Sequence, residues 1–347
     1  MRHPFALLAA ATLACTPASQ PAERSTFDPT RDSGPLACEP RFAGFEPPSS
    51  VERVTAASDS SLLLVYAGAR EVVVVDGDLS PIRTLLLERE GPTGVARLHD
   101  AALLDDSLVV VADGPRRLLR AFAPNGRSAW VVRLPAVPDR VLSTPAGPVV
   151  FPLQLAGLPG RGAYLVRDGA TRDLGVEPVV LDDPQMRTLA NLTSPALARG
   201  TSTLVVPRQF IAPVATVVDL DEKVRPRTVP MPLAEAVAHR AWWAPGPPYA
   251  GEDMERIVAP AMSATSGPGR GEISVLTRTG AYSGTYLEKV VVRLDSELRV
   301  TSSMTLPFNA IHLAWLASEE AYYIMTADEA WYRCRLPSRP TFSEPGP

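Results

Sequence analysis

The sequence is nearly without lysine, and it has few aromatic residues and no long basic run. Lys223 and Lys289 are the only lysines among 34 basic residues in 347, aromatic residues make up 6%, and the net charge is −4. No run of basic residues exceeds two, so the chain has no electrostatic footprint for nucleic acid. We therefore expect no nucleic-acid partner.

Catalytic motifs are also missing. The sequence contains no G-x-S-x-G, no H-E-x-x-H, no Walker-type G-K-[ST] and no C-x-x-C. The G-x-G fragments in Gly157–Gly162 and Gly267–Gly271 do not join a strand to a helix, and we interpret them as loops. We expect no cofactor, and no catalytic residue can be named.

Short acidic clusters do not form a calcium loop. Asp76-Gly77-Asp78 and Asp219–Asp221 are not followed by a twelve-residue run of oxygen ligands. Aspartate and glycine are favoured in turns for backbone reasons. We therefore interpret both clusters as turns and expect no metal site.

The N-terminus has the pattern of an export signal. Arg2 and His3 precede an apolar stretch from Phe5 to Ala14, which is too short to span a bilayer. Residues 12–15 (TLAC) resemble a bacterial lipobox, with Thr where Leu is usual. We expect residues 1–14 to be a signal peptide and Cys15 to be lipidated. The alternative is ordinary cleavage with an unmodified Cys15.

The lipobox resemblance also implies a cellular location. Thr16 replaces the Asp that marks inner-membrane retention, so the expected location is the outer membrane, facing the periplasm or the surface. Several acyl chains would hold the protein firmly on the membrane. Residues 15–35 are polar and rich in proline and predict a disordered tether, and residues 338–347 predict a disordered tail.

The folded region, residues 36–337, contains 40- to 50-residue units of short strands. In Gly91–Arg127, three apolar runs (Ala96–Leu104, Leu108–Ala112 and Leu118–Phe122) end at Pro124-Asn125-Gly126, where Asn-Gly is a signal for a two-residue hairpin. Such a small sheet needs copies of itself to bury both faces. Proline (36 residues) and glycine (23) are frequent enough to supply many turns.

The turn of this unit recurs along the chain. Its markers are Gly77, Gly126, Gly169, Glu222 and Glu297. Spacings of about 40–50 residues are typical of propeller blades. The last spacing is too long for one blade, and Met231–Glu255 explains the excess as an insertion between blades four and five, with a short helix in LAEAVAHRAWW. We predict an all-β propeller of six four-stranded blades, with five or seven as alternatives.

The two ends of the folded region are predicted to meet. A sixth unit begins at Asn309 and lacks its fourth strand, while Leu36–Phe45 has no local partner and would complete that blade. This places Cys38 beside Cys334, and exported chains favour a disulfide there. The alternative is two unrelated buried thiols.

The opening unit resembles an NHL repeat. Gly91-Pro92, Val110–Asp113, Arg117-Leu118 and Phe122 with the turn after it match the pattern of that repeat. The resemblance implies a six-bladed propeller of the NHL type. Members of that superfamily include binding scaffolds as well as lyases and hydrolases, so the resemblance does not decide the chemistry.

Four blades place a cationic or titratable residue nine positions before the second strand: Arg53, His99, Arg140 and His312. In a propeller these positions begin the innermost strands, at the mouth of the central channel. Converging arginine and histidine suit an anionic ligand. The alternative is a neutralised rim, because Glu52, Asp100 and Asp139 are direct neighbours.

The insertion concentrates aromatic residues in a chain that has few: His239, Trp242, Trp243 and Tyr249. They form a candidate surface for a protein partner. The alternative is that they pack the insertion onto its own blade.

The sequence thus favours a lipid-anchored binding or scaffold protein of the cell envelope, which recognises an anionic small molecule or a protein partner at the channel face. The second hypothesis is a lyase or hydrolase that uses His99 and His312 as acid and base. A third is a structural subunit of an envelope complex. The ligand, the partner and the oligomeric state are not specified by the sequence.

Overall fold

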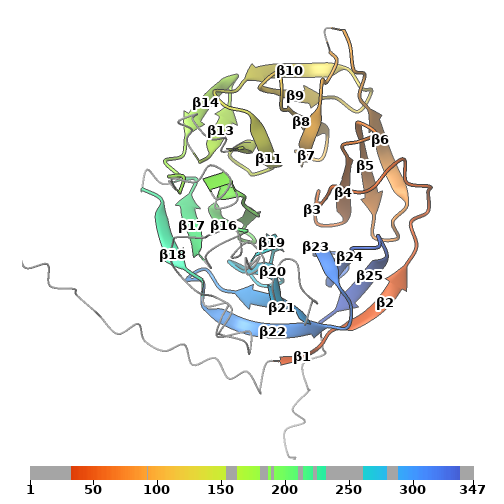
Figure 1. The fold of residues 1–347 in the computed structure, drawn as a ribbon, viewed down its shortest axis with the longest axis vertical. Coiled ribbons are helices and arrows are strands. Elements are labelled where there is room, and N and C mark those ends of the chain that lie inside the picture. The colour runs from red at the N-terminus through yellow and green to blue at the C-terminus, as the bar shows by residue number, and fades with distance from the viewer. Residues whose placement is uncertain are drawn as a thin grey trace, which may run out of the picture.

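The computed structural model describes residues 33–91, 93–153, 162–179, 187–188, 191–209, 214–221, 225–231, 261–279 and 288–336. These residues form six sheets arranged around a central axis, each built on four antiparallel strands, with almost no helix (Figure 1). The all-β, six-bladed prediction is confirmed, and the five- and seven-bladed alternatives are excluded. Among the described residues there is no helix of sufficient length and apolarity to cross a bilayer.

Each blade has four antiparallel strands, which are given below in order from the channel outward. Blades one to three comprise β3 (Arg53–Ala56), β4 (Ser61–Tyr66), β5 (Glu71–Asp76) and β6 (Pro81–Leu86); β7 (Leu98–Leu104), β8 (Leu108–Asp113), β9 (Leu118–Phe122) and β10 (Ser128–Arg133); and β11 (Pro138–Leu142), β12 (Val149–Pro152), β13 (Tyr164–Arg167) and β14 (Ala170–Asp173).

Blades four to six follow the same plan. They comprise β15 (Ala196–Leu197), β16 (Thr203–Pro207), β17 (Val214–Asp219) and β18 (Arg227–Pro230); β19 (Ser263–Ser266), β20 (Ile273–Thr279), β21 (Glu288–Leu294) and β22 (Val300–Leu306); and β23 (Ala310–Leu316), β24 (Ala321–Thr326), β25 (Trp331–Arg335) and β2 (Ala37–Arg41).

The core is divided into six clusters, and each cluster lies between two neighbouring blades. The second strand of a blade is therefore buried on both faces, and every residue of β4 (SLLLVY) is buried. The outermost strands cover the core with only one face, so β6 leaves Ile82 and Leu86 exposed. Continuous apolar runs in the middle strands are what such two-sided packing requires.

The turns between third and fourth strands explain the acidic clusters. Asp76 Oδ1 accepts hydrogen bonds from the backbone N–H of Asp78 (2.9 Å) and Ser80 (2.8 Å). Asp219 and Asp295 accept equivalent bonds in blades four and five. These are Asx turns, and no group of three metal-ligating side chains occurs among the described residues.

The turn of blade two is longer than the Asn-Gly signal predicts. Ser128 pairs with Phe122, so five residues rather than two connect β9 to β10. The N–H of Gly126 bonds the carbonyl of Ala123 (2.9 Å), and Gly126 has φ +74°. Pro124 and the Asx bond of Asn125 to the N–H of Arg127 (3.1 Å) favour this wider turn.

The ring closes as predicted. β2 pairs antiparallel with β25, so the N-terminal segment supplies the outer strand of blade six. Cys38 lies opposite Cys334 in the register, and a disulfide joins them. The alternative of two unrelated thiols is excluded.

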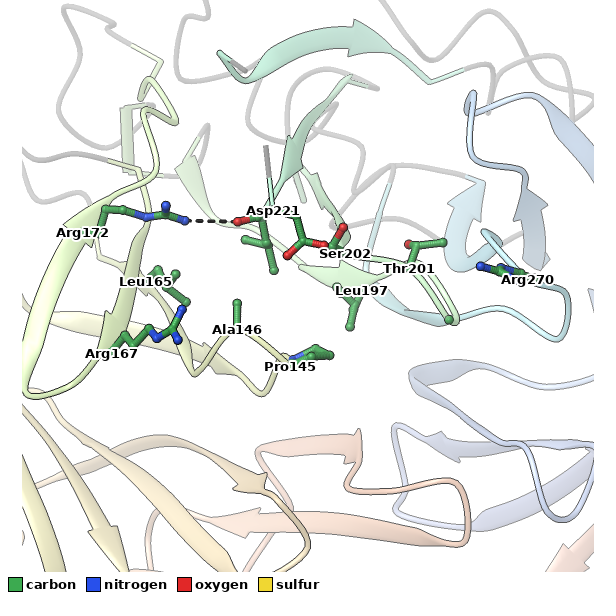
Figure 2. Close-up of a pocket in the computed structure, with 12 residues that line it drawn as sticks. Pro145, Ala146, Leu165, Arg167, Arg172, Leu197, Thr201, Ser202, Asp221 and Arg270 are labelled. Atoms are coloured by element: carbon green, nitrogen blue, oxygen red, sulfur yellow. Dashed lines mark hydrogen bonds between the residues drawn. The ribbon is translucent and has the colours of Figure 1, made fainter. Parts of the chain in front are cut away.

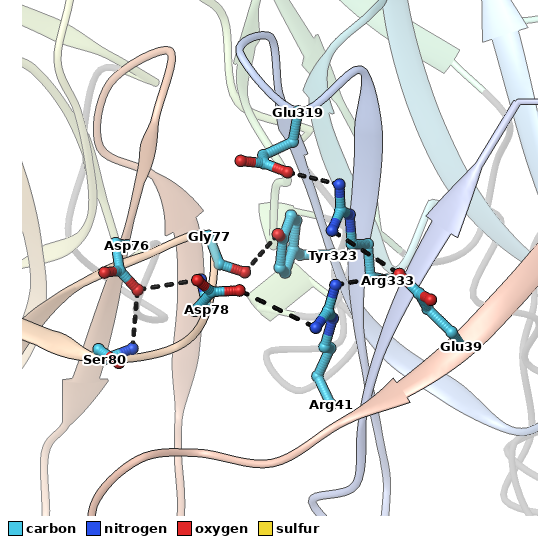
Figure 3. Close-up of polar contacts among 9 residues, drawn as sticks. All are labelled: Glu39, Arg41, Asp76, Gly77, Asp78, Ser80, Glu319, Tyr323 and Arg333. Atoms are coloured by element: carbon cyan, nitrogen blue, oxygen red, sulfur yellow. Dashed lines mark hydrogen bonds and ion pairs between the residues drawn. The ribbon is translucent and has the colours of Figure 1, made fainter.

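Polar side chains tie the closing blade to blade one (Figure 3). Tyr323 donates a hydrogen bond to the carbonyl of Gly77 (2.5 Å), and Arg41 lies 3.9 Å from Asp78. Arg333 pairs with Glu319 (2.5 Å) and lies 3.7 Å from Glu39. The closure is thus held by the β2–β25 ladder, the disulfide and contacts across the blade boundary.

One boundary differs from the prediction. Residues Ser33–Pro35, assigned to the tether, form β1 and pair in parallel with β22 of blade five. Strand pairing at a sheet edge uses only backbone groups, so the polar composition of this segment gave no signal. The predicted insertion lies outside the described residues, because residues 232–260, between β18 of blade four and β19 of blade five, are not among them.

Candidate functional site at the central channel

The predicted rim residues lie near the starts of the innermost strands. Arg53 begins β3, and His99, Arg140 and His312 lie within the first three residues of β7, β11 and β23. These strands face the axis of the ring (Figure 1), where β3 contacts β23 and β7 contacts β11.

Three of the four predicted residues line one small cavity in the channel. Arg53, Arg140 and His312 surround a volume of about 60 Å³, and the blade-two residue in its wall is Asp100. His99 instead packs against Gly114, where a Cβ would clash with its imidazole. His99 does not line this cavity, but Arg53 and Asp139 both act on its pKa, so it lies in the same group of charged residues.

Loop length explains why Asp100, rather than His99, lines the cavity. The first two strands of blade two are joined by three residues, 105–107, whereas those of blade three are joined by six, 143–148. A residue nine positions before the second strand therefore lies at a different height in the channel in blade two than in blade three. The pairing also shifts register around His99, Asp139 and Ile311, so the residues that follow them line the cavity.

Asp100 is the functional candidate that the fixed spacing missed. Its side chain is 2% exposed, and its two carboxylate oxygens accept bonds from the N–H groups of Ala101 and Val141, each at 2.9 Å. The bond to Val141 connects blade two to blade three. Burial raises the pKa of Asp100 to about 7, against the opposing effect of Arg53.

Both histidines are held neutral. Burial, and then the charge of Arg53, lower the pKa of His312 to about 3. Burial and Arg97 lower the pKa of His99, while Asp139 opposes them. Neither imidazole therefore carries a positive charge at neutral pH, and the cationic character of the channel rests on its arginines.

The acidic neighbours offset part of that charge. Arg140 Nε lies 3.8 Å from Asp139, which is an ion-pair distance but too long for a hydrogen bond. Burial raises the pKa of Asp139, while Arg53 and His99 act against that shift. Two arginines thus face the carboxyl groups of Asp139 and Asp100, and burial raises the pKa of both.

The arginines retain unused donors. Nη1 of Arg53 donates to the carbonyl of Glu52 (2.6 Å). The Nε atoms of Arg53 and Arg140 are both buried and have no hydrogen-bond partner within the described part of the chain. Because neither Nε is exposed to solvent, an anionic group in the cavity would bind the guanidinium groups through their other N–H donors.

The remaining predicted residues are outside the described part of the chain. Cys15 and the aromatic group of His239, Trp242, Trp243 and Tyr249 all lie there, and their roles stay predictions. Met262, which follows the insertion in the chain, lines the channel cavity.

Comparison with known proteins identifies the fold and no family. No family model matches the chain. No curated protein matches it. A member of the DUF4221 family from Bacteroides vulgatus is similar in structure, with a TM-score of 0.58, 12% identity, and coverage of 86% of this chain and 95% of that one.

Virginiamycin B lyase from Staphylococcus aureus is similar as well. Its TM-score is 0.52 at 9% identity, with 84% of this chain and 82% of the lyase covered. A catalytically inactive variant of that lyase, solved with quinupristin, matches with a TM-score of 0.52 at 10% identity. At these identities the likeness extends to the propeller fold alone.

Proposed function

We propose that this chain is a lipid-anchored binding or scaffold protein of the bacterial cell envelope, which recognises an anionic group of a small molecule or protein partner in its channel. The observation that carries the proposal is that two arginines, Arg53 and Arg140, line one small cavity in the channel. Guanidinium groups bind carboxylates and phosphates through paired N–H donors. The volume of about 60 Å³ suits one such group rather than a whole large ligand.

The proposed location rests on two features. The TLAC sequence at residues 12–15 supports lipidation of Cys15 after export. The Cys38–Cys334 disulfide supports an oxidising compartment, because such bonds persist outside the cytosol. The tether would then hold the ring at the outer membrane, with the resemblance of residues 91–127 supporting an NHL-type propeller.

The chemistry of the histidines favours binding over catalysis. A general acid or base works best with a pKa near the working pH, whereas His312 has a pKa of about 3. Arg53 lowers the pKa of both histidines, so it opposes the protonation that an acid catalyst needs. We therefore place the lyase or hydrolase hypothesis second.

The proposal is tested by calorimetric titration of the purified protein with inorganic phosphate and with acetate at low salt. We expect saturable binding that Arg140→Gln weakens about tenfold or more, since a charge-assisted hydrogen bond is lost. Arg140→Lys should retain part of the affinity, because it keeps the charge and loses the planar fork.

Arg127→Gln, an exposed arginine in the β9–β10 turn, is the matched control and should bind as the wild type does. Equal affinity in Arg140→Gln and the wild type would contradict the proposal, as would the failure of both anions to bind.

A further inference from the structure

A second hollow lies at the opposite end of the inner strands from the channel cavity (Figure 2). It has a volume of about 940 Å³ and opens between blades three, four and five. Pro145 and Ala146 follow the end of β11, and Gly200–Ser202 follow the end of β15, whereas Arg53 and Arg140 lie near strand starts. We call this hollow the groove. Its volume is at the upper end of the ~300–1,000 Å³ usual for ligand sites.

Arginines dominate the charge of the groove, although the whole chain has a net charge of −4. Among the described residues of its lining, the charged ones are Arg167, Arg172, Arg270 and Asp221. The first two arginines lie on one side of the groove and Arg270 lies on the other (Figure 2). A ligand with two separated anionic groups would match this distribution.

The arginines have donors available. Arg172 donates through Nη2 to the carbonyl of Leu220 (3.3 Å), which fixes its side chain across the boundary between blades three and four. Arg270 is exposed. Arg167 lies 3.6 Å from Asp168, but both side chains are largely exposed, and such pairs are weak.

The middle of the groove offers acceptors and apolar surface rather than further cations. Ser202 Oγ already donates to Asp219 Oδ1 (3.2 Å), so toward a ligand it can act as an acceptor. The carboxylate of Asp221 is a second acceptor in the lining. Ala146, Leu165 and Leu197 supply apolar contacts beside them.

We propose that the groove binds an oligosaccharide that carries carboxylate groups. Arginines on the two sides would hold carboxylates, Asp221 and Ser202 would accept hydrogen bonds from sugar hydroxyls, and the apolar residues would contact the C–H faces of the rings. A simple anion would use the arginines alone and would be repelled by Asp221. The site is separate from the channel cavity and does not depend on the function proposed for it.

The test is a calorimetric titration of the purified protein with trigalacturonate, with maltotriose as a neutral sugar and a glutamate tripeptide as an acidic non-sugar. We expect trigalacturonate to bind at least about tenfold more tightly than either. Arg270→Gln and Arg167→Gln should each weaken that binding severalfold, while Arg127→Gln and the channel variant Arg140→Gln leave it unchanged. Circular dichroism and melting temperature establish that each variant is folded.

Asp221→Ala separates sugar recognition from charge attraction. It should weaken trigalacturonate binding and strengthen any binding of inorganic phosphate to the groove, because it removes both a hydroxyl acceptor and a negative charge. The proposal is overturned if trigalacturonate does not bind, if the tripeptide or maltotriose binds equally well, or if Arg270→Gln has no effect. Loss of binding in Arg140→Gln alone would assign the sugar to the channel and also overturn it.

Discussion

Cys38 and Cys334 lie directly opposite each other on β2 and β25, and their disulfide joins residues 296 positions apart in the sequence. The bond therefore fastens the first long strand of the propeller to the last one. The ring of blades stays closed only if β2 stays paired with β25. The disulfide therefore stabilises the ring as a whole rather than a local loop.

We predict that the double variant Cys38→Ala/Cys334→Ala folds but is less stable. In the chain-entropy model a loop of this length contributes at most about 5 kcal/mol to the free energy of unfolding. Urea unfolding measures the loss, and wild-type protein in reducing buffer should show a comparable midpoint. Identical midpoints with and without the disulfide would show that the β2–β25 ladder closes the ring without it.

Tyr323→Phe tests the polar contact across the closure. The variant loses the hydrogen bond to the carbonyl of Gly77, and we expect the free energy of unfolding to fall by about 1 kcal/mol. Tyr332→Phe is the control, because the ring of Tyr332 stacks on Phe308 with centroids 4.0 Å apart and is retained. A loss in Tyr323→Phe no larger than in the control would refute the contribution of this bond.

The channel residues predict opposite pH dependences for two variants. Asp100 has a pKa near 7 when folded and 3.8 ordinarily, so between these values the folded state holds the extra proton and stability falls as pH rises. His312 has a pKa near 3 when folded and 6.5 ordinarily, so over that interval the unfolded state holds the extra proton and stability rises. The two effects oppose each other between pH 4 and 6.5.

Removing either Asp100 or His312 should reveal how the other group changes the free energy of unfolding with pH. Relative to the wild type, Asp100→Asn should add a rising slope and His312→Gln a falling slope, each up to about 1.4 kcal/mol per pH unit. Asp139 and His99 also titrate in this cluster, and both remain in either variant. Urea midpoints measured at several pH values give the slopes, and two slopes of the same sign would contradict the assignment.

Cys15→Ser tests the membrane anchor. Without the thiol no acyl chain can be attached, so we expect the protein to move from the membrane fraction to the soluble fraction after export. Metabolic labelling with palmitate should mark the wild type and leave the variant unlabelled. An unlabelled wild type would support the alternative, ordinary cleavage with an unmodified Cys15.

The fold was predictable because its signals repeat. Apolar middle strands such as EVVVVD at Glu71–Asp76 must be buried on both faces, and the turn after each recurs at blade spacing. The closure was predictable because a missing strand at one end matched a spare strand at the other. β1 was not predictable, because its pairing uses backbone groups that composition does not report.

The site was only partly predictable. The spacing placed Arg53, Arg140 and His312 around one cavity, whereas in blade two Asp100, the neighbour of His99, lines it. The difference arises from unequal loops between first and second strands, which have no clear signature in a single sequence. The groove was missed because its arginines come from two blades, three and five, that only the ring brings together.

The most direct test of the proposed function is a crystal structure of the protein soaked in inorganic phosphate. The account predicts a phosphate in the channel cavity, within hydrogen-bond distance of the guanidinium groups of Arg53 and Arg140. A cavity that holds only water, or two arginines that turn away from it toward other protein partners, would contradict the account.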